Sequence, residues 1–195
     1  METRSLAAAL RGRATGVLFF GCFGALWIAL ALLGAHRMGS PELTLVALGW
    51  IALVSPACWL LRRTGPVAVA KSKDASDLQR ERVFRTVNIA QWVAIGIAVP
   101  LLSLLHLDLY IPPVIAVIVG LHLLPLARLF HYPLHFLTGA ALIAWAIGIA
   151  LGADAADVAF LTALGVGLIL WLSAWVTLAR SLVLYRGARP ALLAS

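Results

Sequence analysis

The side chains best suited to binding or catalysis are a histidine and two amides inside long apolar stretches. His122 lies in one stretch, and Asn88 and Gln91 lie in another. An imidazole can serve as acid, base or ligand near neutral pH, and an amide in an apolar medium needs a hydrogen-bond partner. If two helices bring these residues together, Gln91 or Asn88 can hydrogen-bond the His122 ring. The pattern therefore predicts a small polar site in the protein interior.

Hydroxyl side chains in two later stretches extend this site. Thr138 lies at a depth similar to that of Gln91, and Thr162, Ser173 and Thr177 fall within a narrow arc of one helical face. Such hydroxyls can line a pocket, or they can hydrogen-bond between helices and fix their packing. Both interpretations stay open. The predicted ligand pocket comprises His122, Gln91, Asn88, Thr138, Ser173 and Thr177.

A proline and a glycine close to His122 predict a change in the local backbone. Pro125 removes one helical hydrogen bond and frees a carbonyl about one turn earlier, near Leu121. Together with Gly120 it predicts a kink beside the histidine, and a kink there can open a small cavity.

Two further histidines have spacing that suits a metal on a helix. His131 and His135 are four residues apart, but Pro133 between them favours a turn, and structural metal sites usually use four ligands. They are weak metal candidates, and no cofactor is predicted.

The chain carries no recognisable catalytic motif. It has neither the HExxH pattern of zinc hydrolases nor the Gly-x-Ser-x-Gly pattern of serine hydrolases, and no Asp or Glu lies within an apolar stretch. Since ion-coupled pumps usually place carboxylates at mid-membrane, a carboxylate-driven transporter is disfavoured.

Six apolar stretches must position these residues. Of the 195 residues, 63% are hydrophobic and 12% are charged, where soluble domains carry about a quarter charged residues. Each stretch is close to the ~20 residues needed to cross a bilayer, and a chain in lipid must satisfy its backbone groups as helices. The sequence predicts an all-α, single-domain bundle of six transmembrane helices. Their spans are 14–34, 43–61, 87–105, 112–130, 134–151 and 158–178, with a cytoplasmic loop at 62–86.

The first span is longer than the apolar region of a cleaved signal peptide, so we expect it to be retained. With the amino terminus inside, fourteen of the fifteen Lys and Arg residues fall on the cytoplasmic side and Arg37 alone falls outside. The net charge of +7 is then a signal of topology rather than of nucleic-acid binding. We expect an N-in, C-in protein of the bacterial inner (plasma) membrane, with membrane lipids as partners.

One part of the chain resembles a known family. Asn88-x-x-Gln91, followed by Gly120-x-His122-x-x-Pro125 and Tyr132, is similar to a family of small bacterial inner-membrane proteins of uncharacterised function. These proteins pair an Asn/Gln helix with a Gly-x-His-x-x-Pro helix. The resemblance groups those residues as one unit, but the family brings no reaction with it.

Three functions fit these observations. The first is a non-enzymatic protein that binds or translocates a small molecule through a cytoplasm-facing polar pocket around His122. The second is a membrane enzyme acting on a lipid or quinone, with His122 as acid or base and Arg128 or Arg180 recognising an acidic head. The third is a structural or assembly subunit. Glycines such as Gly24 and Gly167 suit close helix packing within the chain or in a homo-oligomer.

Overall fold

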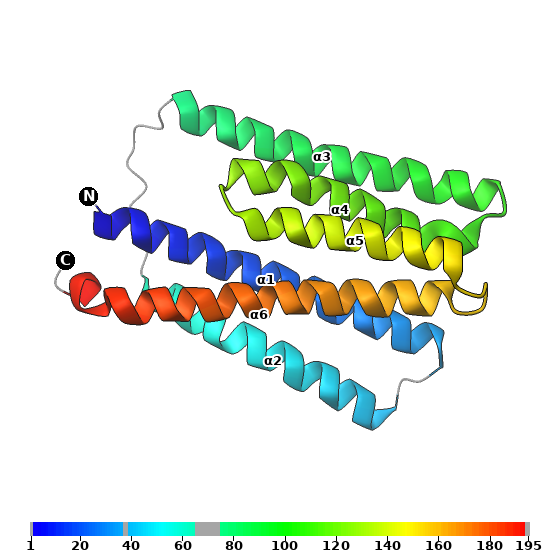
Figure 1. Ribbon diagram of the computed structural model, residues 1–195, viewed down its shortest axis with the longest axis horizontal. Coiled ribbons are helices and arrows are strands. Elements are labelled where there is room, and N and C mark those ends of the chain that lie inside the picture. Colours follow the sequence, from blue (N-terminus) through cyan, green and yellow to red (C-terminus); the bar gives the residue numbers. More distant parts are fainter. Residues whose placement is uncertain (1, 37–38, 65–74, 194–195) are drawn as a thin grey trace.

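The computed structural model describes residues 2–36, 39–64 and 75–193 (Figure 1). These residues contain no strand, and six α-helices and one short 3-10 turn account for most of them. The elements are α1 (Glu2–Gly34), α2 (Ser40–Arg63), α3 (Ala75–Leu104), η1 (Asp108–Tyr110), α4 (Ile111–Leu129), α5 (Pro133–Gly152) and α6 (Val158–Leu193). Each α-helix contains a window long and apolar enough to cross a membrane. The prediction of an all-α chain with six such helices is confirmed.

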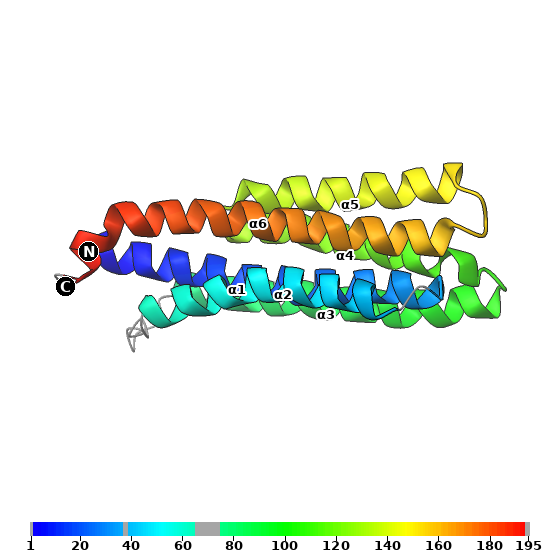
Figure 2. The same ribbon diagram turned by 90° about the horizontal axis from the view of Figure 1, so that it is seen from below.

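The helices lie roughly antiparallel, and α1 and α6 form the central pair. α2 packs beside α1, the α4–α5 hairpin packs against α6, and α3 lies at the edge against α4 (Figures 1 and 2). Among its described side chains, residues 78–104, α3 has no buried residue. Both chain ends lie at the same end of the bundle as the α4–α5 turn (Figure 1).

Three helices are longer than the apolar spans suggest. α1 begins at Glu2 rather than near 14, α3 begins at Ala75 rather than near 87, and α6 continues to Leu193 rather than to 178. Hydropathy marks only the apolar part of a helix. Ala, Arg, Glu and Gln are good helix formers, so a helix can continue through polar sequence until a breaker ends it.

The predicted loop at 62–86 is correspondingly shorter. α2 ends at Arg63, and positions 75–86 form the first turns of α3. Positions 65–74, with Lys71 and Lys73, and Arg37 in the connection between α1 and α2 lie outside the described residues.

Helix ends follow the turn chemistry of the sequence. Pro112 and Pro113 lie in the first turn of α4, and Pro133 is the first residue of α5, positions where proline costs no helical hydrogen bond. Two residues after the end of α4 at Leu129, His131 is in the left-handed conformation with a φ of 49°. The next amide, of Tyr132, donates to the carbonyl oxygen of Ala127 at 3.0 Å, the pattern of a Schellman motif.

Small residues allow the central pair to approach closely. A Cβ atom at Gly24 would lie 3.0 Å from the carbonyl oxygen of Gly167, and one at Gly167 would lie 2.8 Å from the carbonyl oxygen of Gly24. The predicted role of these two glycines in close helix packing is confirmed. Beside them, Trp171 Nε1 donates to the carbonyl oxygen of Gly21 at 3.0 Å.

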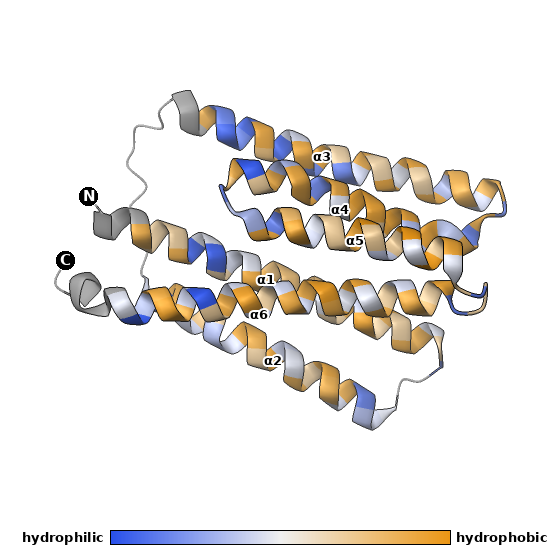
Figure 3. Ribbon diagram, in the orientation of Figure 1, coloured by the Kyte–Doolittle hydropathy of each residue, from blue (hydrophilic) through white to orange (hydrophobic). Residues whose placement is uncertain are grey.

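The two ends of the bundle differ in charge, although hydrophilic residues gather at both of them (Figure 3). We call the end with both termini and the α4–α5 turn the basic end. Its described charged side chains are those of Arg11, Arg13, Arg62, Arg63, Arg80, Glu81, Arg82, Arg85, Arg128, Arg180 and Arg186. At the opposite end the described charged side chains are acidic: Glu42, Asp108, Asp154 and Asp157.

Candidate functional site

The predicted pocket residues fall into two separate groups. The first lies between α3 and α4. His122 Nδ1 is 3.3 Å from the carbonyl oxygen of Val87, so the half-buried imidazole can donate a hydrogen bond to the neighbouring helix. Asn88 does not bond the imidazole, because its Nδ2 donates to the carbonyl oxygen of Phe84, one turn earlier on α3, at 2.8 Å. The prediction of an amide–imidazole hydrogen bond is therefore wrong for Asn88. Among the described residues, no hydrogen bond joins Gln91 to His122 either.

The second group lies between α5 and α6 and is more deeply buried. Thr138 Oγ1 and Ser173 Oγ are 2.7 Å apart, and Thr177 Oγ1 donates to the carbonyl oxygen of Ser173 at 2.8 Å. All three residues are buried. Ser181, one turn further along, is also buried and donates to the carbonyl oxygen of Thr177 at 2.7 Å. These hydroxyls satisfy one another and the backbone, which costs less in an apolar interior than leaving them unpaired.

The α4–α5 contact explains the role of Gly120. A Cβ atom at Gly120 would lie 2.7 Å from the carbonyl oxygen of Gly139 on α5. Gly120 is therefore needed for close packing of the hairpin. Pro125 is tolerated inside α4, which runs as one helix from Ile111 to Leu129.

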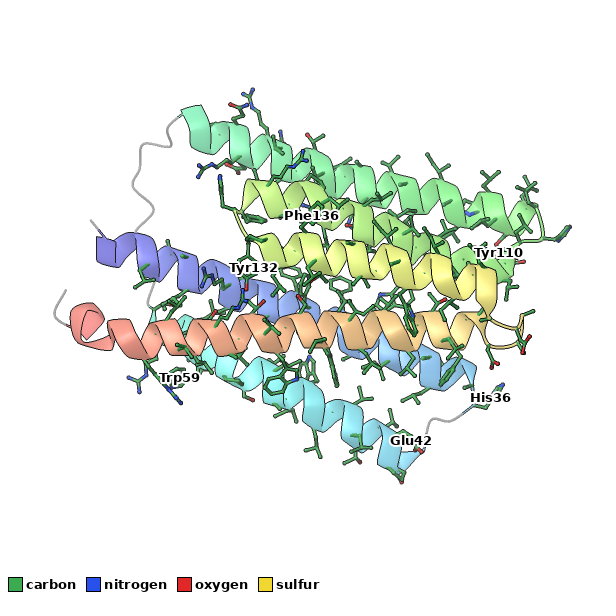
Figure 4. The ribbon with its side chains drawn as sticks, viewed as in Figure 1. His36, Glu42, Trp59, Tyr110, Tyr132 and Phe136 are labelled. Atoms are coloured by element: carbon green, nitrogen blue, oxygen red, sulfur yellow. The ribbon has the colours of Figure 1, made fainter. Side chains whose placement is uncertain are left out.

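Tyr132 connects the α4–α5 turn to α1 and α6. Its hydroxyl donates to Thr177 Oγ1 at 3.1 Å, and the guanidinium carbon of Arg13 lies 5.3 Å from its ring centroid. The latter is within the range of a cation–π interaction. Figure 4 places Tyr132 between the start of α5 and α1. The turn is thereby fixed to both central helices.

His135 lies among aromatic rings instead of among metal ligands. The ring centroids of Tyr132, Phe20 and Phe130 are 5.1, 5.4 and 6.4 Å from that of the imidazole. Its Nδ1 is buried with no hydrogen-bond partner. His131 belongs to the turn and His135 to the helix, so the expected turn is confirmed. No group of three potential metal-ligating side chains occurs in the part of the chain that the structure describes.

Two open grooves lie on either side of His131. The Phe84 groove, of about 450 Å³, is lined by Arg80, Glu81, Phe84, Leu129, Phe130 and His131. The Phe136 groove, of about 550 Å³, is lined by Ala127, Arg128, His131, Pro133 and Phe136. His122 lines neither groove. Concave surface and cationic side chains thus coincide at the turn.

Sequence reasoning missed the roles of Tyr132, Arg13 and Ser181. Ser181 lies four residues after Thr177, which lies four after Ser173, so helical spacing could have added it. The contact between Arg13 and Tyr132 joins residues far apart in the chain, so no local spacing in the sequence predicts it. The left-handed conformation that places His131 between the grooves has no reliable sequence signal either, since glycine and asparagine are the usual residues there.

The fold and the distribution of polar groups define a class: a helical protein with six apolar, membrane-length helices, which indicates a multi-pass membrane protein. No family model, no curated protein and no solved structure matches the chain. The resemblance to small bacterial inner-membrane proteins stays a prediction.

Proposed function

We propose that this chain is an inner-membrane protein with both termini in the cytoplasm, and that it binds a small acidic molecule at its basic end without catalysing a reaction. The observation that carries the proposal is the position of His131 between two grooves, with Arg80 lining one and Arg128 the other. Both grooves are open to the surface, so a ligand bound in either would stay partly exposed. We therefore centre the site on His131 instead of His122.

The positions of the basic side chains support the proposed orientation. Every described acidic side chain except Glu81 lies at the end opposite the ten described arginines. Cytoplasmic segments retain Lys and Arg far better than translocated segments. An acidic ligand from the cytoplasm would thus meet the basic end.

The interior of the bundle supports a binding protein better than a protein that translocates a solute. Thr138, Ser173 and Thr177 are committed to hydrogen bonds with each other or with the backbone. A translocation path needs polar groups that can exchange protein partners for the solute. The imidazole of His122 is likewise placed against the backbone of α3, which suits a link between helices.

The test is ligand-dependent stabilisation of the purified protein in a neutral detergent. Inorganic phosphate, glycerol phosphate and octanoate serve as probes, and the melting temperature is the readout. We expect at least one probe to raise the melting temperature, and Arg128→Gln to remove that rise. His131→Gly should act similarly while keeping the left-handed turn.

Arg62→Gln is the matched control, because Arg62 is an exposed arginine at the basic end that lines neither groove. It should leave the response unchanged. Equal loss of response in Arg62→Gln and Arg128→Gln would show a non-specific charge effect and refute the proposed site.

A further inference from the structure

The two grooves differ in charge, although they share His131. The Phe84 groove contains both Arg80 and Glu81. The Phe136 groove contains Arg128 and no acidic side chain. An anion is therefore attracted more strongly to the Phe136 groove, where a guanidinium and an imidazole can both donate hydrogen bonds.

Helix lengths give the level of this groove in a bilayer. α4 has 19 residues and α5 has 20, so at ~1.5 Å per residue each is roughly 30 Å long, close to the thickness of a hydrocarbon core. The α4–α5 turn then lies where hydrocarbon meets headgroups. α1, α3 and α6, with 33, 30 and 36 residues, extend past the turn at the basic end (Figure 1).

Apolar side chains continue from the groove along the outside of the bundle. Phe136, labelled in Figure 4, is 52% exposed, and the adjacent Leu137 is 64% exposed. On α4, Leu121 is 53% exposed and lies seven residues before Arg128, on the same helical face. If the acidic head of a ligand lies at Arg128, the rest of the ligand lies against exposed apolar side chains. An acyl chain can make these apolar contacts, whereas a free inorganic anion cannot.

From this juxtaposition we infer that the acidic ligand is the headgroup of an anionic phospholipid, which enters the Phe136 groove sideways from the bilayer leaflet at the basic end. Its phosphate accepts hydrogen bonds from Arg128 and His131, and its acyl chains lie along the exposed faces of α4 and α5. The inference rests on the proposed function and names the class of ligand for that site.

The experiment reconstitutes the full chain into vesicles of equimolar phosphatidylcholine and phosphatidylglycerol. Lipids that stay bound after extraction into neutral detergent are then measured by native mass spectrometry. We expect phosphatidylglycerol to be retained over phosphatidylcholine. Arg128→Gln should lower this preference about fivefold, the factor that corresponds to about 1 kcal/mol for one interfacial arginine.

Arg128→Lys and Arg62→Gln are the comparison variants. Lysine keeps the charge and should keep most of the preference, and Arg62→Gln should keep all of it. An equal loss in Arg62→Gln and Arg128→Gln would overturn the groove assignment, because it would indicate a diffuse layer of lipid around the basic end.

The remaining outcomes separate this inference from the proposed function. If glycerol phosphate or inorganic phosphate stabilises the protein through Arg128, but phosphatidylglycerol is not enriched, the lipid assignment is wrong and the anion site stands. If neither soluble anion nor anionic lipid shows a preference that depends on Arg128, both proposals are refuted. A melting curve of each variant without ligand verifies that it is folded.

Discussion

Gly120 on α4 and Gly139 on α5 face each other with almost no space between their backbones. A Cβ atom on Gly120 would lie 2.7 Å from the carbonyl oxygen of Gly139, and one on Gly139 would lie 2.6 Å from the carbonyl oxygen of Gly120. Both residues are buried. This contact holds the hairpin whose turn carries His131, so it positions the proposed site from a distance.

Gly120→Ala is expected to destabilise the protein even though alanine is the better helix former. The added methyl group meets a backbone oxygen that cannot rotate away, and overpacking of this kind typically costs about 1–3 kcal/mol. The measurement is thermal or denaturant unfolding in detergent. Gly148→Ala is the control, because a Cβ atom at Gly148 has no neighbour within 4 Å. Equal stability of the Gly120 variant and the wild type would contradict this packing.

A double-mutant cycle at Thr138 and Ser173 tests the buried hydrogen bond between α5 and α6. Their hydroxyl oxygens are 2.7 Å apart. We expect Thr138→Val and Ser173→Ala to destabilise singly and to show a coupling energy of roughly 0.6 kcal/mol, the average for such bonds in one membrane protein. The free energy of unfolding of all four proteins gives the coupling. Strictly additive effects would mean that the two hydroxyls do not interact.

His122→Leu tests the link between α4 and the edge helix α3. The imidazole is 3.3 Å from the carbonyl oxygen of Val87, and α3 has no buried side chain among residues 78–104, so it packs on α4 through half-buried residues such as Val87. We expect faster hydrogen exchange in α3, with the other helices unchanged, because one interhelical bond is lost. His106→Asn is the control, since His106 is exposed and Asn also tolerates its positive φ. Unchanged exchange in α3 would argue against the link.

Cysteine labelling tests the proposed orientation. In a chain with Cys22 and Cys58 replaced by Ala, Arg186→Cys introduces a thiol at the basic end and Asp154→Cys introduces one at the opposite end. A membrane-impermeant maleimide added to intact cells should label the thiol at position 154 and leave that at position 186 unlabelled. After the cells are opened, both should react. The reverse pattern would place the basic end outside and contradict the charge rule.

Sequence reasoning predicted most of the fold and only part of the site. Long apolar stretches separated by prolines are local signals, so the number of helices and the openings of α4 and α5 were predicted correctly. The lengths of α1, α3 and α6 were underestimated at their charged ends, because hydropathy falls at residues such as Arg80 and Arg186 although the backbone there stays helical. The composition of the pocket was harder to predict, because helical spacing gives the face on which Asn88 lies but does not give the helix that packs against this face.

The sequence by itself determined that this chain forms six apolar helices, and it determined which charges gather at each end. Both follow from side-chain hydropathy along the chain, a property that each segment carries without its neighbours. Only the tertiary structure decided that Asn88 and His122 are not hydrogen-bonded, that Thr138 pairs with Ser173, and that His131 lies between two grooves. Those relationships depend on which helices pack together and at what register, and that is set by many distant contacts at once, such as Gly120 against Gly139.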